Sequence, residues 1–273
     1  MESIPVRGIQ IPRLGFGTFR MPGNDCQPVV ESALEAGYRH IDTASMYQNE
    51  DAVGAALAAS GLPRSELFLT TKVWHDQLTP EGIRQSLLRS LANLKVDQVD
   101  LFMIHWPSAD MDMASVMETM VSLQQQGLTR GVGVCNFTLS MLRESIDALQ
   151  APIAAVQVEY HPFLDQSKIL GFLRERGIPL TAYAPLAQGR AAADPALAAI
   201  GAKYGASAAQ VAVAWLLDQP GVVAIPKARR IESQLANLAS TNVRLDDADR
   251  AVIAALPKDQ RHVRPPFSPA WDD

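Results

Sequence analysis

Four side chains suited to acid–base chemistry stand at or just beyond the ends of apolar segments. Asp42, Lys72 and His105 each close an apolar run, and Tyr47 lies in the segment that follows Asp42. Taken alone, each has a simple structural explanation, because a polar residue at the end of a strand usually only meets solvent. Together, a carboxylate, an ammonium group, an imidazole and a phenol are the complementary groups of general acid–base catalysis. If the fold brings them together, they predict an active site.

The elements that must position these side chains alternate between apolar β-type runs and helical patterns. Most runs lack the polar alternation of a half-exposed strand, which is typical of parallel strands buried on both faces. Eight such runs separated by helices predict an α/β fold, a single (β/α)8 TIM barrel domain over residues 1–273. The carboxyl ends of its strands would open on one face and bring the four side chains together. The expected strands are residues 14–17, 40–43, 67–72, 99–105, 131–136, 154–160, 179–184 and 222–226.

Several helices between these runs have recognisable starts. Thr79 before Pro80 is typical of an N-cap followed by proline at the first helical position. Ser207 and Gln210 have the spacing of a capping box. Thr138 is expected to cap a helix with one apolar face, made of Leu139, Leu142, Ile146 and Leu149.

A doubly wound sheet is the rival fold, and its glycine fingerprint fails twice. Arg20 stands where the third glycine should follow Gly15 and Gly17, and Asn136 stands there after residues 131–133. Outside the barrel we expect an N-terminal β-hairpin that turns at Arg7-Gly8 and a proline-rich C-terminal loop over the active site.

The composition excludes several classes of function. Hydrophobic residues make up 48% of the 273, and the net charge of −5 gives no broad attraction to nucleic acid or to an anionic membrane. The two cysteines, Cys26 and Cys135, have neither zinc nor redox spacing, and no histidine has metal-ligand spacing. Without a leader-like or membrane-spanning segment, we expect a cytoplasmic protein without a metal.

The chain carries the motif Gly-Tyr-Arg-His-Ile-Asp-Thr-Ala at residues 37–44. This motif is similar to the first signature of the aldo-keto reductase family, which the sequence resembles across nearly its whole length. Segments in three further places point to one bacterial subgroup of it, at residues 17–20, 127–130 and 268–272. The other family landmarks follow in the family's order, at residues 47–50, 70–74, 104–107, 133–137, 156–162 and 225–227.

The resemblance implies a catalytic tetrad of Asp42, Tyr47, Lys72 and His105. Reduction of a carbonyl leaves an alkoxide that Tyr47 would protonate, although a free phenol with a pKa of about 10 is a sluggish acid. The ammonium group of Lys72 would lower that pKa, and Asp42 would hold Lys72 charged. His105 would donate a hydrogen bond to the carbonyl oxygen and orient it.

The resemblance also implies NADPH (NADP+) as the cofactor. Thr18, Phe19 and Asp42 would border the nicotinamide ribose, Asn136 and Gln157 would hold the carboxamide, and Tyr183 would stack on the ring. Cys135 stands where the family usually has serine. Whether this position keeps a contact to the cofactor like that of the serine hydroxyl is therefore left undecided. Leu186 completes the expected set on this side.

For the phosphate end, three cations lie within four residues, Lys227, Arg229 and Arg230, with Asn237 further along. They would suit the 2′-phosphate that NADH lacks. Many family members follow the lysine with serine and place an arginine and a glutamate later, whereas this chain has Ala228, Ser233 and Ala236. Either Arg229 or Arg230 could replace that arginine, and the alternative is a solvated basic turn.

The substrate implied is a small carbonyl compound. Trp74 and Trp106 follow tetrad members and would form the apolar walls of the pocket, with Phe267 or Trp271 closing over it. The candidates are α-ketoaldehydes such as methylglyoxal, aromatic aldehydes, β-keto esters and 2,5-diketo-D-gluconate, acted on by a monomer. Two alternatives stay open: a cofactor-binding regulator like the potassium-channel β-subunits, and a barrel hydrolase that uses paired carboxylates.

Overall fold

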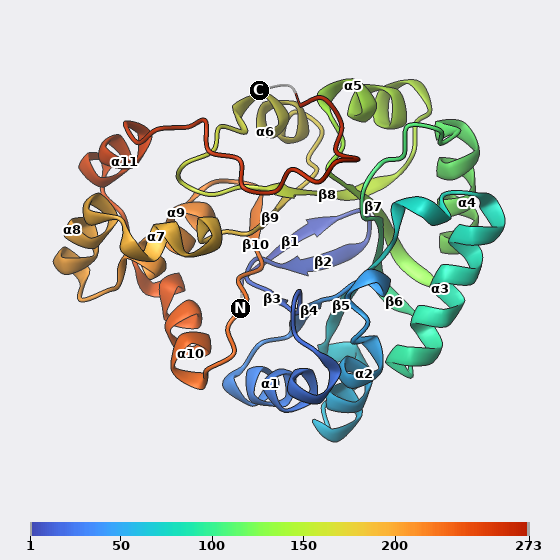
Figure 1. Ribbon diagram of the computed structural model, residues 1–273, viewed down its shortest axis with the longest axis horizontal. Helices are drawn as coiled ribbons and strands as arrows, with labels where there is room; N and C mark the ends of the chain where they lie inside the picture. Colours follow the sequence, from blue (N-terminus) through green and yellow to red (C-terminus); the bar gives the residue numbers. More distant parts are fainter. Residues whose placement is uncertain (1, 272–273) are drawn as a thin grey trace.

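Eight parallel strands pair in chain order and form the wall of a barrel (Figure 1). The computed structural model describes residues 2–271. Leu14 forms a parallel bridge with Ala224, and the Gly15 amide donates to the Ala224 carbonyl at 2.9 Å, which closes the barrel between its first and last strands. The strands are β3 (Phe16–Gly17), β4 (His40–Asp42), β5 (Phe68–Val73), β6 (Val99–Ile104), β7 (Thr129–Cys135), β8 (Ile153–Glu159), β9 (Leu180–Tyr183) and β10 (Val222–Ala224). The predicted (β/α)8 fold is confirmed.

All eight predicted strands are present, with ends that move by one or two residues. Strand β3 is the shortest, because Leu14 pairs with β10 whereas Phe16 and Gly17 pair with β4. The strands are built almost entirely of buried residues, which explains why the sequence shows no polar alternation along them. A side chain at Gly17 would come within 2.9 Å of the Ile225 carbonyl, so the close approach at the seam requires glycine there.

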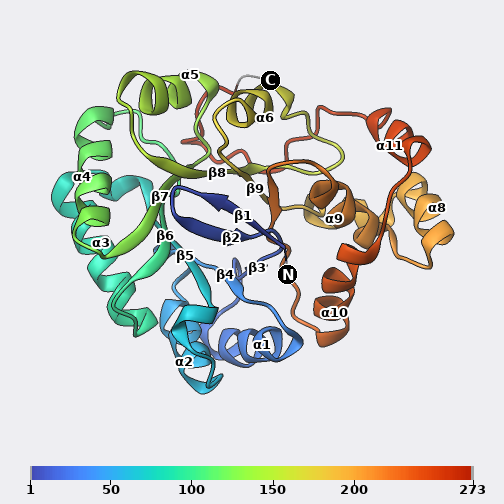
Figure 2. The same ribbon diagram turned by 180° about the vertical axis from the view of Figure 1, so that it is seen from behind.

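Helices surround the barrel (Figures 1 and 2). Thr79 caps its helix by accepting a hydrogen bond from Gly82, and Ser207 and Gln210 form the predicted capping box. No helix in the span 2–271 is long and apolar enough to cross a membrane. The helices are α1 (Gly23–Ala36), α2 (Glu50–Ala59), α3 (Pro80–Leu94), α4 (Met113–Gln125), α5 (Leu139–Leu142), α6 (Ser167–Arg174), α7 (Arg190–Ala193), α8 (Pro195–Tyr204), α9 (Ala208–Asp218), α10 (Ile231–Ala239) and α11 (Asp247–Ala254).

One predicted helical face is only partly correct. Thr138 caps α5 as expected, and Leu142 and Ile146 are buried, but Leu149 is exposed. The helix widens into a π-helical stretch, Arg143–Ala148, directly after α5. The wider turn advances fewer degrees per residue, so a face counted at the α-helical period drifts away from the core.

The predicted hairpin and the C-terminal tail lie at opposite ends of the barrel. Strands β1 (Ser3–Val6) and β2 (Ile9–Pro12) turn at Arg7-Gly8, where both residues have positive φ. The hairpin covers one end of the barrel (Figure 2). Its residues Val6, Ile9 and Ile11 pack with Phe68 and Leu101 of the barrel strands. The tail, residues 255–271, crosses the other end, which we call the mouth (Figure 1). The predicted loop over the strand ends is therefore present.

Candidate active site

The centre of the mouth holds a buried ion pair between two adjacent strands. The Nζ atom of Lys72 lies 2.5 Å from Asp42 Oδ1 and donates to the Thr43 carbonyl at 2.9 Å. The Gln157 amide donates to the second oxygen, Asp42 Oδ2, at 2.9 Å. Burial opposes the charge on Lys72, but Asp42 and Tyr47 outweigh it and raise the lysine pKa above its ordinary value. Lys72 is therefore a fixed cation.

Tyr47 lies beside this pair on a single helical turn, Ser45–Tyr47. Its ring centre is 5.3 Å from Lys72 Nζ and 5.4 Å from the His105 ring. Burial raises the pKa of Tyr47 to about 12, although Lys72 acts in the opposite direction. The expected effect of Lys72, which is to lower the pKa of the phenol, is therefore present, but desolvation of the phenolate outweighs it and the net shift is upward.

Two residues that the sequence interpretation left without a role hold the turn of Tyr47 in place. Asn49 is buried and donates to the Thr18 and Met21 carbonyls, each at 3.0 Å. Glu50 begins α2, is buried, and accepts from the Thr71 hydroxyl at 2.5 Å. The sequence offered one indication of them, because both lie in the family landmark at residues 47–50.

His105 follows β6 on the same face. Its backbone amide donates to the Val73 carbonyl at 2.9 Å, and Asn136 donates to its carbonyl at 2.9 Å. Burial, together with the charge of Lys72, holds the pKa of the imidazole well below its ordinary value. The buried Nδ1 atom has no hydrogen-bond partner among the described residues. His105 is thus neutral and keeps one N–H donor.

The residues expected around the nicotinamide line one side of this cluster. Tyr183 donates its hydroxyl to Asn136 Oδ1 at 2.8 Å, and Asn136 has a positive φ of 61°. The Thr18 hydroxyl donates to the Asp42 carbonyl, whereas Phe19 is 44% exposed with its ring 5.0 Å from the Tyr47 ring. An exposed aromatic side chain at the edge of polar buried groups fits a flat heteroaromatic ligand.

Cys135 turns its side chain toward the barrel interior. Its Sγ atom lies 3.9 Å from Met103 Sδ and is fully buried. Burial raises the pKa of the thiol far above its ordinary value. The neighbouring Asn136 and Gln157 both present their amides within the tetrad network. The thiol is thus an interior packing group beneath the site.

The three predicted cations gather on one exposed loop. Burial, followed by the charges of Arg229 and Arg20, lowers the pKa of Lys227. Arg229 donates to the Arg20 carbonyl at 3.0 Å and pairs with Asp25 at 3.5 Å. Arg230 is exposed at the N-cap of α10. Crowded cations of this kind fit a bound phosphate group. Arg20 also belongs to this cation cluster, although the sequence interpretation assigned it no role.

Two further residues of the expected cofactor set lie apart from that loop in the sequence. Asn237 is buried on α10. Leu186 is half-buried in the segment after β9. In that segment Ala184, Ala187 and Gln188 all have positive φ, a conformation that costs energy for residues other than glycine and is concentrated at binding loops.

Aromatic side chains from the barrel and the tail form the wall of the mouth. The Phe267 ring centre lies 5.5 Å from Trp74 and 5.6 Å from Trp106, and it stacks on His75 at 4.1 Å. Trp271 lies 5.9 Å from Trp106. Both tail aromatics named by the sequence interpretation therefore reach the predicted substrate walls, and His75 is a wall residue that it missed.

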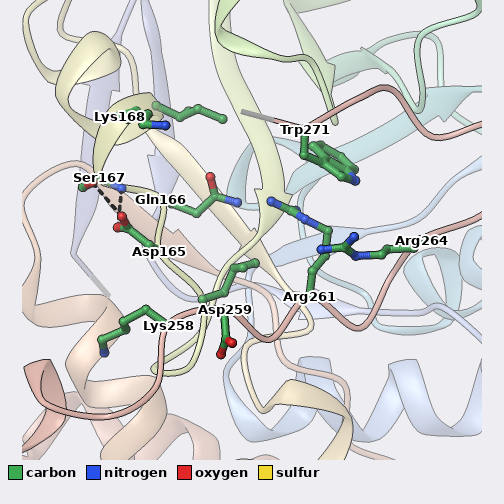
Figure 3. Close-up of a pocket in the computed structure, with 11 residues that line it drawn as sticks. Asp165, Gln166, Ser167, Lys168, Lys258, Asp259, Arg261, Arg264 and Trp271 are labelled. Atoms are coloured by element: carbon green, nitrogen blue, oxygen red, sulfur yellow. Dashed lines mark hydrogen bonds between the residues drawn. The ribbon is translucent and has the colours of Figure 1, made fainter. Parts of the chain in front are cut away.

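Behind Trp271, the tail and the start of α6 enclose a cavity of about 260 Å³ (Figure 3). Arg261 lies over the Trp271 ring at 4.0 Å on this side. Within residues 2–271, no group of three or more His, Cys, Asp or Glu side chains is arranged to hold a metal ion.

Comparisons with known proteins show the family to which the chain belongs. The sequence model of the aldo/keto reductase family matches residues 13–258. Methylglyoxal reductase DkgB of Escherichia coli O157:H7 is 41% identical over 266 residues, 96% of this chain and 99% of the relative. Glyoxal reductase of Bacillus subtilis (strain 168) is 36% identical over 255 residues, 93% of this chain and 92% of the relative.

Among solved structures, a crystal structure that carries the name 2,5-diketo-D-gluconic acid reductase B superposes with a TM-score of 0.97. The two chains are 40% identical, and the match covers 100% of this chain and 98% of the other. Residues 17–20, 127–130 and 268–272 indicated the bacterial subgroup of 2,5-diketo-D-gluconate reductase B, and these similarities confirm that prediction.

Proposed function

This chain belongs to the aldo/keto reductase family, and we propose that it reduces small aldehydes and ketones with NADPH, with Tyr47 as the proton donor. The observation that carries this proposal is the cluster at the barrel mouth. Asp42, Lys72 and His105 come from three adjacent strand ends. The Tyr47 ring lies 5.3 Å from Lys72 Nζ and 5.4 Å from the His105 ring. Tyr47 is protonated, Lys72 is charged and His105 is neutral, which are the states that carbonyl reduction needs.

Each member of the cluster has a separate task. Tyr47 is protonated at neutral pH and gives its proton to the oxygen that becomes an alkoxide. Lys72 stabilises the phenolate left behind, and Asp42 keeps Lys72 charged and aimed. The neutral His105 donates a hydrogen bond to the carbonyl oxygen and orients it.

The bound cofactor supplies the hydride for the carbonyl carbon. Asn136 and Gln157 would hold its carboxamide, and Tyr183, whose hydroxyl donates to Asn136, would stack on its ring. The crowded cations at Lys227 and Arg229 suit the 2′-phosphate that distinguishes NADPH from NADH.

In support of a reducing, cytoplasmic setting, both cysteines are free and buried.

For the substrate we propose α-ketoaldehydes, with methylglyoxal first. Relatives that match over nearly the whole chain are named methylglyoxal reductase and glyoxal reductase. The walls made by Trp74, Trp106 and Phe267 also accept aromatic aldehydes and β-keto esters. The structural relative named for 2,5-diketo-D-gluconic acid adds that sugar acid to the candidates.

A carbonyl panel tests the proposal. NADPH oxidation is followed at fixed enzyme concentration with methylglyoxal, glyoxal, a nitrobenzaldehyde, a β-keto ester and 2,5-diketo-D-gluconate, and kcat/KM is compared. We expect turnover that requires carbonyl and cofactor together, with methylglyoxal among the best substrates. Cofactor binding without turnover on any carbonyl would instead support the regulatory alternative.

A further inference from the structure

Glu159, the last residue of β8, is a buried carboxylate that the proposed mechanism does not use. It has no exposed surface, yet both of its oxygens are hydrogen-bonded. Oε1 accepts from His161 Nε2 at 3.1 Å and from the backbone N–H of His262 at 2.8 Å. Oε2 accepts from the backbone N–H of Val263 at 2.9 Å. Two of the three donors therefore belong to the C-terminal tail, far away in the sequence.

The protonation state of His161 follows from its second nitrogen. The Phe163 amide donates to His161 Nδ1 at 3.3 Å, so the hydrogen sits on Nε2 and points at Glu159. Burial lowers the pKa of His161, which keeps the imidazole neutral. The carboxylate is thus surrounded by N–H donors, and its charge strengthens each bond.

These bonds fasten the tail just before it crosses the mouth. Upstream, Gln260 donates to the Phe163 carbonyl at 3.0 Å. Downstream lie Phe267 and Trp271, which contact the substrate walls. Beside this stretch, the cavity shown in Figure 3 separates the tail from the start of α6. In the sequence, the two amides that bind Glu159 lie between Gln260 and the aromatic residues Phe267 and Trp271.

We propose that Glu159 is a positioning residue for the substrate pocket: by fixing the His262 and Val263 amides it sets where Phe267 and Trp271 stand over the mouth. This inference rests on the proposed reductase function. Glu159 touches no reacting group and acts only through the tail. Its loss should therefore affect substrates large enough to contact Phe267 much more than it affects small ones.

The test compares two variants that break the same bonds from opposite sides. In Glu159→Gln one oxygen becomes an NH2 group that faces an N–H donor, so one donor loses its partner. Val263→Pro removes one donor and leaves the carboxylate in place, and Val263→Ala is its matched control because it keeps the N–H. For a bulky aromatic aldehyde, we expect KM to rise about tenfold in Glu159→Gln and Val263→Pro, as loss of hydrogen bonds to a charged acceptor allows.

Three readouts separate positioning from general damage. The kcat for methylglyoxal and the affinity for NADPH should stay within about twofold of the unmodified protein, because the tetrad is untouched. Trypsin should cleave faster after Arg261, which directly precedes the anchored amides. Combining Glu159→Gln with Phe267→Ala should raise KM no further than Phe267→Ala alone.

Additive effects of Glu159→Gln and Phe267→Ala, or an equal loss of kcat for small and bulky substrates, would overturn the inference. So would unchanged tail cleavage in both anchor variants. The exposed Glu175→Gln serves as the charge-matched control and should change nothing. An unmodified protein without carbonyl turnover would overturn the proposed function, which is a separate result from normal turnover with an undisturbed tail.

Discussion

The Nζ atom of Lys72 lies 2.5 Å from Oδ1 of Asp42, and neither side chain reaches solvent. The pair joins the ends of β4 and β5, neighbouring strands of the barrel. A buried pair of this kind gives little net stability, since removing both charges from water offsets their attraction. Its value is that it holds a cation in a fixed place beside Tyr47.

Breaking this pair on one side should be costly for the fold. Lys72→Met leaves the Asp42 carboxylate buried without its counter-charge, and we expect the free energy of unfolding to fall by about 3–5 kcal/mol. The double variant Asp42→Asn with Lys72→Met should recover most of that loss while remaining inactive. Urea unfolding measures both. A single variant as stable as the unmodified protein would contradict this account.

Tyr47→Phe removes the proposed proton donor and little else. The ring stays between Lys72 and His105, so NADPH binding, followed by fluorescence titration, should be unchanged. We expect kcat for methylglyoxal to fall by about a thousandfold, in the range of an essential acid–base group. Turnover near that of the unmodified enzyme would exclude Tyr47 as the donor.

The pH dependence of reduction follows from the protonation state of Tyr47. A proton donor works only while protonated, and with a pKa of about 12 Tyr47 loses activity only as the pH rises through strongly alkaline values. His105 stays neutral because its pKa is held well below its ordinary value, so it contributes no step near neutrality. We expect kcat/KM to stay flat between about pH 6 and 9. A decline centred near pH 7 would contradict this.

The cation cluster predicts which cofactor is preferred. KM for NADPH should lie well below KM for NADH. Combining Arg229→Ala with Arg230→Ala should reduce the ratio of these two KM values by about tenfold or more. Because Arg229 is already oriented by the Arg20 carbonyl, we expect its single substitution to matter more than that of Arg230. Initial rates with each cofactor measure this, and NADH kinetics should barely change. Equal kinetics with both cofactors in the unmodified protein would contradict the assignment.

Glu159 should make the free energy of unfolding depend on pH in the acidic range. Burial raises its pKa, but hydrogen bonds from His161, His262 and Val263 outweigh burial and place the pKa below its ordinary value. The stability that this group contributes is therefore present above about pH 4.3 and is lost as the pH falls through the folded-state pKa. The difference in urea midpoint between the unmodified protein and Glu159→Gln should shrink as the pH is lowered from 7 to about 3, through the folded-state pKa. A constant difference would show that Glu159 is not ionised in the fold.

The barrel and the positions of the four central residues were predictable because both depend on local patterns. A strand buried on both faces is apolar throughout, and its carboxyl end can be located from the polar residue that closes it, as at Asp42, Lys72 and His105. The order of the strands then places these ends together. The hairpin was equally local, since Arg7-Gly8 specifies its turn.

What the sequence could not show depends on distant contacts or on burial. Nothing near Glu159 indicates that its partners are amides about a hundred residues away. The widening of the helix after Leu142 moves Leu149 out of the core, and no residue type marks it. The direction of the Tyr47 pKa likewise depends on how much desolvation the whole mouth imposes.

The hairpin closes the end of the barrel opposite the mouth, so the two ends differ as attachment points for immobilising the protein on a solid support. A support coupled near residue 2 would hold the protein by its sealed end, with the mouth turned toward the bulk liquid (Figure 2). Immobilised through a linker at that end, the enzyme should respond to dissolved carbonyl at nearly its free rate. Coupling through lysines at random would turn the mouth of some molecules toward the support and lower the measured rate of carbonyl reduction.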